Sequence, residues 1–165
     1  MARLRTLPAI LLIVGCQGPA PTPVPDARLT DAAASYATYG RVDDEKRWAP
    51  WLCREPRKSV LRTSASRDEA THGRKQYYLY ARDRNAYVRA SDAGQPEGQV
   101  VVKESWIQQE KGPLFIMMKR DGDWIYATAT PDGREITASG KLASCRECHE
   151  SDRTRDRVFG LAESE

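Results

Sequence analysis

The sequence QVVVKESWI at residues 99–107 is followed by LFIMMK at 114–119 and WIYATAT at 124–130. All three segments are rich in β-branched and aromatic residues, which favour β-strands. The segments QYYLYA at 76–81 and NAYVRA at 85–90 have the same character. Short polar stretches separate them, and all but the one at 82–84 contain glycine or proline, as between neighbouring strands. The pattern therefore predicts five strands in an antiparallel sheet.

Three of the separating stretches contain strong turn residues: KGP at 111–113, RDGD at 120–123 and PDG at 131–133. Aspartate followed by glycine favours the two-residue turn of a β-hairpin, because both residues tolerate a left-handed backbone. Glycine and proline in KGP are also typical turn residues, so all three stretches are predicted to be turns.

The segment LTDAAASYATY at residues 29–39 has the pattern of a helix. Its apolar side chains recur every three or four positions, at Leu29, Ala33, Tyr36 and Tyr39. Such a spacing places them on one helix face. Thr30 or Asp31 is predicted to cap the helix and Gly40 to end it. The expected fold class is α+β, a mainly antiparallel sheet with flanking helices.

Composition and charge exclude two classes of protein. The 165 residues are 40% hydrophobic and 30% charged, which suits one folded domain. No apolar run reaches the 18 or more residues that a membrane-spanning helix needs, which excludes a polytopic membrane protein. The 26 basic and 23 acidic residues give a net charge of only +3, so no nucleic-acid partner is expected.

The N-terminus has the pattern of an export signal. Arg3 and Arg5 precede an apolar run at 7–14 and then Gly15 and Cys16, the order typical of a secretory signal peptide. The stretch IVGC at 13–16 resembles the lipobox of bacterial lipoproteins. The resemblance implies a signal peptide at 1–15 and lipidation of Cys16. An ordinary signal peptide, leaving Cys16 unmodified, is the alternative.

A proline-rich stretch follows the proposed anchor. The sequence GPAPTPVPD at 18–26 has proline at every second position from 19 to 25, which favours extended polyproline II structure. Residues 16–26 are therefore predicted to be a lipid anchor and linker, and residues 27–165 the folded domain. Gln17 is not the aspartate associated with inner-membrane retention. The expected location is the periplasmic side of the cell envelope, with the outer membrane favoured.

The most specific motif lies near the C-terminus. Cys145, Cys148 and His149 form the pattern C-x-x-C-H, which is typical of covalent attachment of c-type haem. Two thiols on one turn reach the two vinyl groups of haem, and the adjacent histidine binds the iron. Ser144 and Glu147 match a capping box, so a helix is predicted to start here.

Three other interpretations of the motif remain open: a thioredoxin-like redox pair, a structural disulfide between Cys145 and Cys148, and a zinc site. Zinc could be bound by Cys145 and Cys148 with two of His149, His72 and Cys53. If the haem interpretation holds, Cys53 is left over and is expected to be a buried thiol, with an intermolecular disulfide as the alternative.

The sixth ligand of a haem iron would determine the function. Electron carriers usually fill this position with methionine or histidine, whereas an open position binds small molecules. The candidates are Lys103, His72, Met117 and Met118. The two methionines are adjacent in a predicted strand, so they are expected to point to opposite faces.

Several segments in this order resemble the cytochrome P460 family, which is related to the cytochromes c′-β. They are THG at 71–73, GQVVVKE at 98–104, MMK at 117–119, GDWIY at 122–126, the C-x-x-C-H motif and DRVF at 156–159. Together they cover roughly residues 60–160.

The resemblance implies a small antiparallel β domain with one covalent haem c and an open distal side. Cys145 and Cys148 would form the thioether bonds, and His149 would be the proximal ligand. Lys103 matches the lysine that is joined to the haem ring in the hydroxylamine-oxidising members. A solvated strand lysine is the alternative for Lys103. A Lys103 that faces the haem would share its strand face with Val101 and Ser105.

One departure from the family pattern concerns the distal side. The members that oxidise hydroxylamine place a carboxylate there, and the matching position here is Phe115. Neither Glu104 nor Glu110 is an obvious substitute. An apolar distal wall resembles the cytochromes c′-β, which bind nitric oxide.

Three functions therefore stay open. The first is redox chemistry on hydroxylamine or nitric oxide at an open iron, and the second is gas binding without turnover. The third is electron transfer by a six-coordinate haem. Expected partners are a small nitrogen-containing ligand and a periplasmic redox protein, with membrane contact through the lipid anchor only. A homodimer is an alternative to a monomer.

Overall fold

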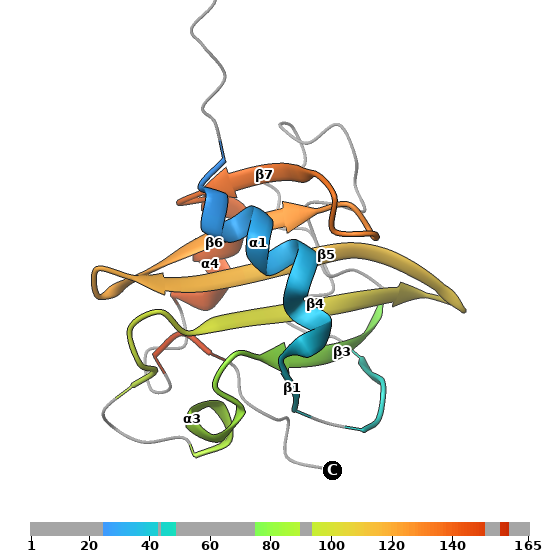
Figure 1. The fold of residues 1–165 in the computed structure, drawn as a ribbon, viewed down its shortest axis with the longest axis horizontal. Coiled ribbons are helices and arrows are strands. Elements are labelled where there is room, and N and C mark those ends of the chain that lie inside the picture. Colours follow the sequence, from blue (N-terminus) through green and yellow to red (C-terminus); the bar gives the residue numbers. More distant parts are fainter. Residues whose placement is uncertain (1–24, 43, 49–74, 90–93, 151–155, 159–165) are drawn as a thin grey trace, which may run out of the picture.

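The computed structural model describes residues 25–42, 44–48, 75–89, 94–150 and 156–158 (Figure 1). The predicted signal peptide, the lipidation site Cys16 and nearly all of the linker lie outside these ranges, as do Cys53 and His72. No helix among the described residues is long and apolar enough to cross a membrane.

The described residues form an α+β fold around one sheet, as the sequence predicted. Every strand pair in the sheet is antiparallel, in the order β1-β3-β4-β5-β6-β7, and β2 also pairs with β3. The strands are β1 (Gly40–Arg41), β2 (Arg47–Trp48), β3 (Gln76–Ala81), β4 (Val100–Ile107), β5 (Glu110–Arg120), β6 (Asp123–Ala129) and β7 (Ile136–Gly140).

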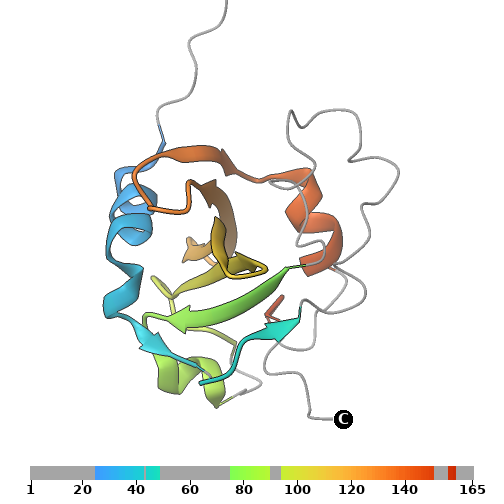
Figure 2. The same ribbon diagram turned by 90° about the vertical axis from the view of Figure 1, so that its right-hand side faces the viewer.

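Two helices lie on opposite sides of this sheet (Figure 2). Helix α1 (Ala27–Ser35) continues into the short 3-10 helix η1 (Tyr36–Thr38), and helix α4 (Ala143–His149) carries the C-x-x-C-H motif. A third helix, α3 (Arg84–Val88), lies beyond the end of β3. The sheet therefore has an α1 face and an α4 face.

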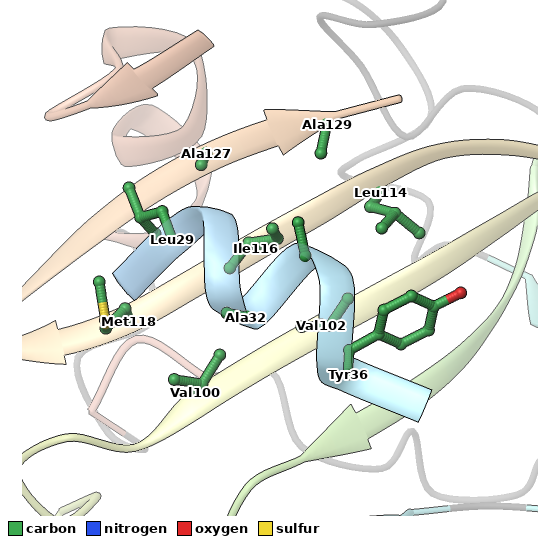
Figure 3. Close-up of a cluster of buried hydrophobic side chains, with 11 residues drawn as sticks. Leu29, Ala32, Tyr36, Val100, Val102, Leu114, Ile116, Met118, Ala127 and Ala129 are labelled. Atoms are coloured by element: carbon green, nitrogen blue, oxygen red, sulfur yellow. The ribbon is translucent and has the colours of Figure 1, made fainter. Parts of the chain in front are cut away.

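The α1 face is closed by an apolar core. Leu29, Ala32 and Ala33 of α1 are at most 1% exposed and pack on side chains of β4, β5 and β6 (Figure 3). The strand side chains in this cluster are Val100, Val102, Leu114, Ile116, Met118, Ala127 and Ala129. They occupy alternate positions along each strand, as one face of a strand requires.

The predicted strands at 76–81, 99–107, 114–119 and 124–130 are confirmed within one or two residues, except that β5 starts earlier. The turn predicted at RDGD, residues 120–123, is also confirmed. Asp121 and Gly122 have φ angles of 52° and 74°, the left-handed backbone of a two-residue hairpin turn.

The strand predicted at 85–90 is wrong, because residues 84–88 form α3. The carboxylate of Asp83 accepts a hydrogen bond from the backbone N–H of Ala86 at 2.9 Å and caps this helix. Only Tyr87 of α3 is buried, so little packing opposes the local preference set by the cap.

The turn predicted at KGP is also wrong, because β5 runs through these residues. The chain turns instead at residues 108 and 109, where Gln108 has a φ of 58°. The register between β4 and β5 shifts between Glu104 and Trp106, which sets Ser105 opposite both Gly112 and Pro113. A bulge of this kind tolerates Pro113, which has no N–H to donate.

The boundaries of α1 differ from the prediction at both ends. The helix starts at Ala27, where Asp26 accepts a hydrogen bond from Arg28 N at 3.0 Å, so neither Thr30 nor Asp31 is the cap. The chain tightens into η1 before Gly40, which begins β1. Strand β7 was not predicted, because its sequence, ITASG, is mostly small and polar.

Candidate functional site

The C-x-x-C-H motif lies on a single short helix. Cys145, Cys148 and His149 all belong to α4, which confirms the prediction of a helix at this point. The predicted capping box is wrong: Ser144 lies inside the helix, and the N-cap residue Leu142 makes no side-chain cap. The carbonyl oxygen of Leu142 accepts hydrogen bonds from the N–H groups of Cys145 and Arg146, both at 3.0 Å.

The two thiols of the motif are not joined in a disulfide. Cys145 packs against the apolar cluster on the α4 face, and its burial raises the pKa of the thiol to about 11. Cys148 is half-buried. Their spacing places both thiols within one turn of the same helix, the arrangement that a bridge to two vinyl groups requires.

The imidazole of His149 is buried and held in one orientation. The residue is 5% exposed, and its Nδ1 lies 2.8 Å from the backbone oxygen of Arg157. A carbonyl oxygen only accepts hydrogen bonds, so Nδ1 carries the proton. In the neutral imidazole Nε2 is then the unprotonated nitrogen, the form in which histidine binds metals. The Tyr126 ring lies beside the imidazole, with 5.5 Å between ring centroids.

The surface under α4 is a second apolar cluster, on the face opposite α1. Its members include Val101 from β4, Met117 from β5, and Trp124 and Tyr126 from β6. Leu142 and Cys145 pack against this cluster and so attach α4 to the sheet.

Lys103 lies on the same face as α4. It is opposite Leu79 of β3 and Phe115 of β5, and it alternates with the α1-facing Val102 and Glu104. Its Nζ is buried and lies 5.1 Å from the centroid of the Tyr77 ring. The positive charge of Lys103 also opposes the burial that raises the pKa of Cys145, which places the ammonium group within electrostatic range of the motif.

The two methionines point to opposite faces, as predicted. Met117 belongs to the cluster on the α4 face, whereas Met118 packs under α1 (Figure 3). Only Met117 therefore remains a sixth-ligand candidate of this pair. His72, the other candidate, lies outside the described residues.

Phe115 is the direct cross-strand neighbour of Lys103. It is half-buried, and the Nζ of Lys75 lies 5.5 Å from its ring centroid. A phenyl ring cannot accept a proton, so this position supplies no base beside Lys103.

Neither nearby glutamate replaces that missing base. Glu104 is 3% exposed and points to the α1 side, where it accepts hydrogen bonds from Lys111 Nζ at 2.7 Å, from Trp106 Nε1 at 2.8 Å and from the Tyr36 hydroxyl. These bonds lower the pKa of Glu104 although its burial raises it. Burial and the bond to Glu104 raise the pKa of Tyr36 to about 12. Glu110 is exposed at the start of β5.

Two features of the site were not predicted. The first is the Arg157 carbonyl that orients His149, since a backbone acceptor leaves no mark on the sequence. The second is Tyr126, whose buried hydroxyl has no hydrogen-bond partner among the described residues. Burial raises the pKa of Tyr126 to about 12. The alternation of β6 could have placed Tyr126 on the α4 face, but nothing in the pattern singled it out.

Among the described residues, no group of three or more histidine, cysteine, aspartate or glutamate side chains is arranged to hold a metal ion. Cys145, Cys148 and His149 therefore do not converge on one point, and the zinc alternative depends on residues outside the described ranges. The chain matches no protein-family model, no curated protein and no solved structure.

Proposed function

We propose that this protein is a monohaem c-type cytochrome of the P460 type. Cys145 and Cys148 would hold the porphyrin through thioether bonds, and His149 would bind the iron. One observation carries the proposal: the C-x-x-C-H helix lies on the sheet face that also contains Lys103, with the His149 Nδ1–H already bound to a backbone carbonyl.

The residues present suit the group that the motif implies. Two thiols and one imidazole on seven residues of helix match the donor set for covalent haem c, and they do not form a single-ion site. The buried imidazole is the tautomer that presents Nε2 to a metal. A bound haem would supply an iron that exchanges electrons and binds small ligands.

The reaction that we propose is redox chemistry on small nitrogen species such as hydroxylamine or nitric oxide. Lys103 supports this function because it shares the α4 face and its Nζ is buried rather than solvated. A lysine held there could join the haem ring or place a hydrogen-bond donor beside it.

Two observations support the other functions. Phe115 beside Lys103 provides an apolar neighbour and no base, which favours gas binding without turnover. Met117 lies on the α4 face, which keeps a six-coordinate electron carrier as a candidate. The export signal predicted at residues 1–15 and the lipobox-like stretch before Cys16 are consistent with attachment of haem in the periplasm and anchoring of the domain to the envelope.

The test is the absorption spectrum of the reduced protein, produced in a host that attaches c-type haem. The wild type is compared with a Lys103→Ala variant and with Lys111→Ala, which removes a lysine from the other side of the sheet. A strongly red-shifted Soret band in the wild type and in Lys111→Ala, lost in Lys103→Ala, is expected if the lysine is joined to the haem.

Other spectra assign the other functions. An ordinary high-spin spectrum in all three proteins would favour gas binding and contradict the cross-link. A low-spin spectrum converted to high spin by Met117→Ala would identify Met117 as the sixth ligand and favour electron transfer. Cys145→Ala/Cys148→Ala is expected to lose all haem that resists denaturing gel electrophoresis. A wild type that also carries no haem would overturn the proposal.

A further inference from the structure

The chain turns sharply just behind α4, at two residues with unusual backbone angles. Asp156 and Arg157 have φ values of 52° and 64°, and neither is glycine. The left-handed region costs free energy for residues with a side chain, and arginine has none of the local hydrogen bonding that helps aspartate there. Two such residues in succession persist only where their surroundings hold them.

The first residue of this turn is held from three directions. The Asp156 carboxylate accepts hydrogen bonds from Lys119 Nζ at 2.6 and 2.8 Å, and from the N–H of Gln95 at 2.9 Å. Its backbone oxygen accepts a hydrogen bond from a third residue, through Trp124 Nε1 at 2.8 Å. Lys119 and Asp156 are only 11% and 19% exposed, so water screens this ion pair weakly.

The second residue of the turn is tied to the start of β6. The guanidinium of Arg157 pairs with the carboxylate of Asp123, and Lys141 Nζ lies 2.9 Å from the other oxygen of that carboxylate. The hydrogen bond from Lys141 holds the pKa of Asp123 well below its usual range. The backbone N–H of Trp124 and the guanidinium of Arg157 lower this pKa further. The next residue, Val158, is 5% exposed and belongs to the cluster on the α4 face.

These contacts converge on one group. The Arg157 carbonyl, which follows the two tied side chains and precedes the buried Val158, is the acceptor for the His149 Nδ1–H at 2.8 Å. The contacts come from β5, β6 and the segment at Gln95, none of which is part of α4. The position of the carbonyl is therefore set by the sheet and not by the helix that carries His149.

We propose that the Asp156–Arg157 turn is a positioning device for the proximal histidine. By fixing the acceptor of the Nδ1–H bond, Asp156 and Lys119 set the orientation of the imidazole and increase the donor strength of Nε2. This inference rests on the proposed function, since it concerns the ligand of a haem iron. Outer hydrogen bonds of this kind tune metal sites through the basicity of the ligand.

The experiment uses the haem-loaded full-length protein with Asp156→Asn, Lys119→Met and Lys119→Arg. The first two remove one partner of the ion pair, and the third keeps the positive charge. Glu104→Gln is the control, because it weakens a buried carboxylate–lysine contact on the opposite face. Two quantities are measured: the reduction potential, and the solvent exchange rate of the His149 Nδ1–H, followed by NMR in a diamagnetic ferrous low-spin form.

Asp156→Asn and Lys119→Met are expected to speed exchange of this proton by on the order of 10-fold or more, the effect of losing one charged hydrogen bond. Both are expected to raise the reduction potential, because a weaker Nε2 donor stabilises the ferric iron less. Lys119→Arg is expected to keep wild-type values, and Glu104→Gln to lower stability without changing either quantity.

Two results would overturn the inference. One is wild-type exchange and potential in a folded, haem-loaded Lys119→Met. The other is equal changes in Lys119→Met and Glu104→Gln, which would show only general loosening of the fold. A chain that takes up no haem at all would instead overturn the proposed function, so the two failures are distinguishable.

Discussion

The two faces of the sheet use the same strands for different purposes. In β4, Val100, Val102 and Glu104 point toward α1, whereas Val101 and Lys103 point toward α4. The α1 face is a core of aliphatic side chains, and its buried carboxylate, Glu104, has hydrogen bonds from three donors. The α4 face instead carries several ionisable side chains, which can bind a ligand or exchange a proton.

On that face lie the buried Lys103 ammonium, the Tyr126 hydroxyl, the Cys145 thiol and the His149 imidazole. Taking polar groups out of water costs free energy that apolar side chains in the same place would not, so folding alone does not explain why they gather on this face. The α1 face therefore supplies stability, and the α4 face carries the candidate function. Substitutions on the two faces should separate stability from haem properties.

The strongest test of this separation is the adjacent pair Met117 and Met118. Met118→Ala is expected to lower the free energy of unfolding by about 2–5 kcal/mol, because it leaves a cavity under α1. Its haem spectrum should stay that of the wild type. Urea unfolding and absorption spectra of the haem-loaded protein measure the two effects.

Met117→Ala provides the matched comparison, with the same atoms removed one residue away. It is expected to change the spectrum or ligand affinity of the haem as well as stability, since Met117 lies on the α4 face. If Met118→Ala altered the haem spectrum and Met117→Ala did not, the assignment of the two faces would be reversed.

Much of this sheet was predictable, because alternation in a strand is a local property. The central strands, the Asp-Gly turn and the opposite directions of Met117 and Met118 follow from neighbouring residues. What failed depends on partners elsewhere. The residues around Pro113 resemble a turn in isolation, and only the bulge opposite Ser105 lets them continue as a strand.

The candidate site also has one part that the sequence predicts and one part that it does not. Cys145, Cys148 and His149 are contiguous, so their motif and helix were visible in the sequence. The acceptor for His149 was not, because the Arg157 carbonyl is positioned by contacts from strands that lie more than 30 residues earlier. A backbone oxygen held by tertiary contacts has no signature in residue type.

A second, smaller effect concerns pH and the α1 face. The hydrogen bonds to Glu104 give it a folded pKa below its usual value of 4.5. A lowered folded pKa stabilises the fold above the unfolded pKa, and this contribution disappears as the pH falls through the folded value. Wild-type stability should therefore decline below about pH 4 in part through Glu104.

Glu104→Gln tests that contribution. At pH 7 the variant is expected to lose about 1–3 kcal/mol, moderated because the partner Lys111 is 46% exposed. As the pH falls below the unfolded pKa and through the lower folded pKa, the difference from the wild type should shrink, since the wild type then loses the stabilising charge of Glu104. Urea unfolding from pH 3 to 7 measures it, and a constant difference across that range would contradict the assigned ionisation.

The smallest effect should come from the cap of α1. Asp26 accepts a hydrogen bond from Arg28 N at 3.0 Å and pairs with Arg120 of β5 at 2.9 Å, so it fixes both the start of the helix and its position on the sheet. Asp26→Ala is expected to cost about 1 kcal/mol, as for other helix caps. Asp26→Asn keeps the cap and loses the charge, and should cost less because the paired arginine is exposed.

Neither variant should change the haem spectrum, since α1 and α4 lie on opposite sides of the sheet (Figure 2). A spectral change in Asp26→Ala would mean that the helix on one face influences the ligands on the other.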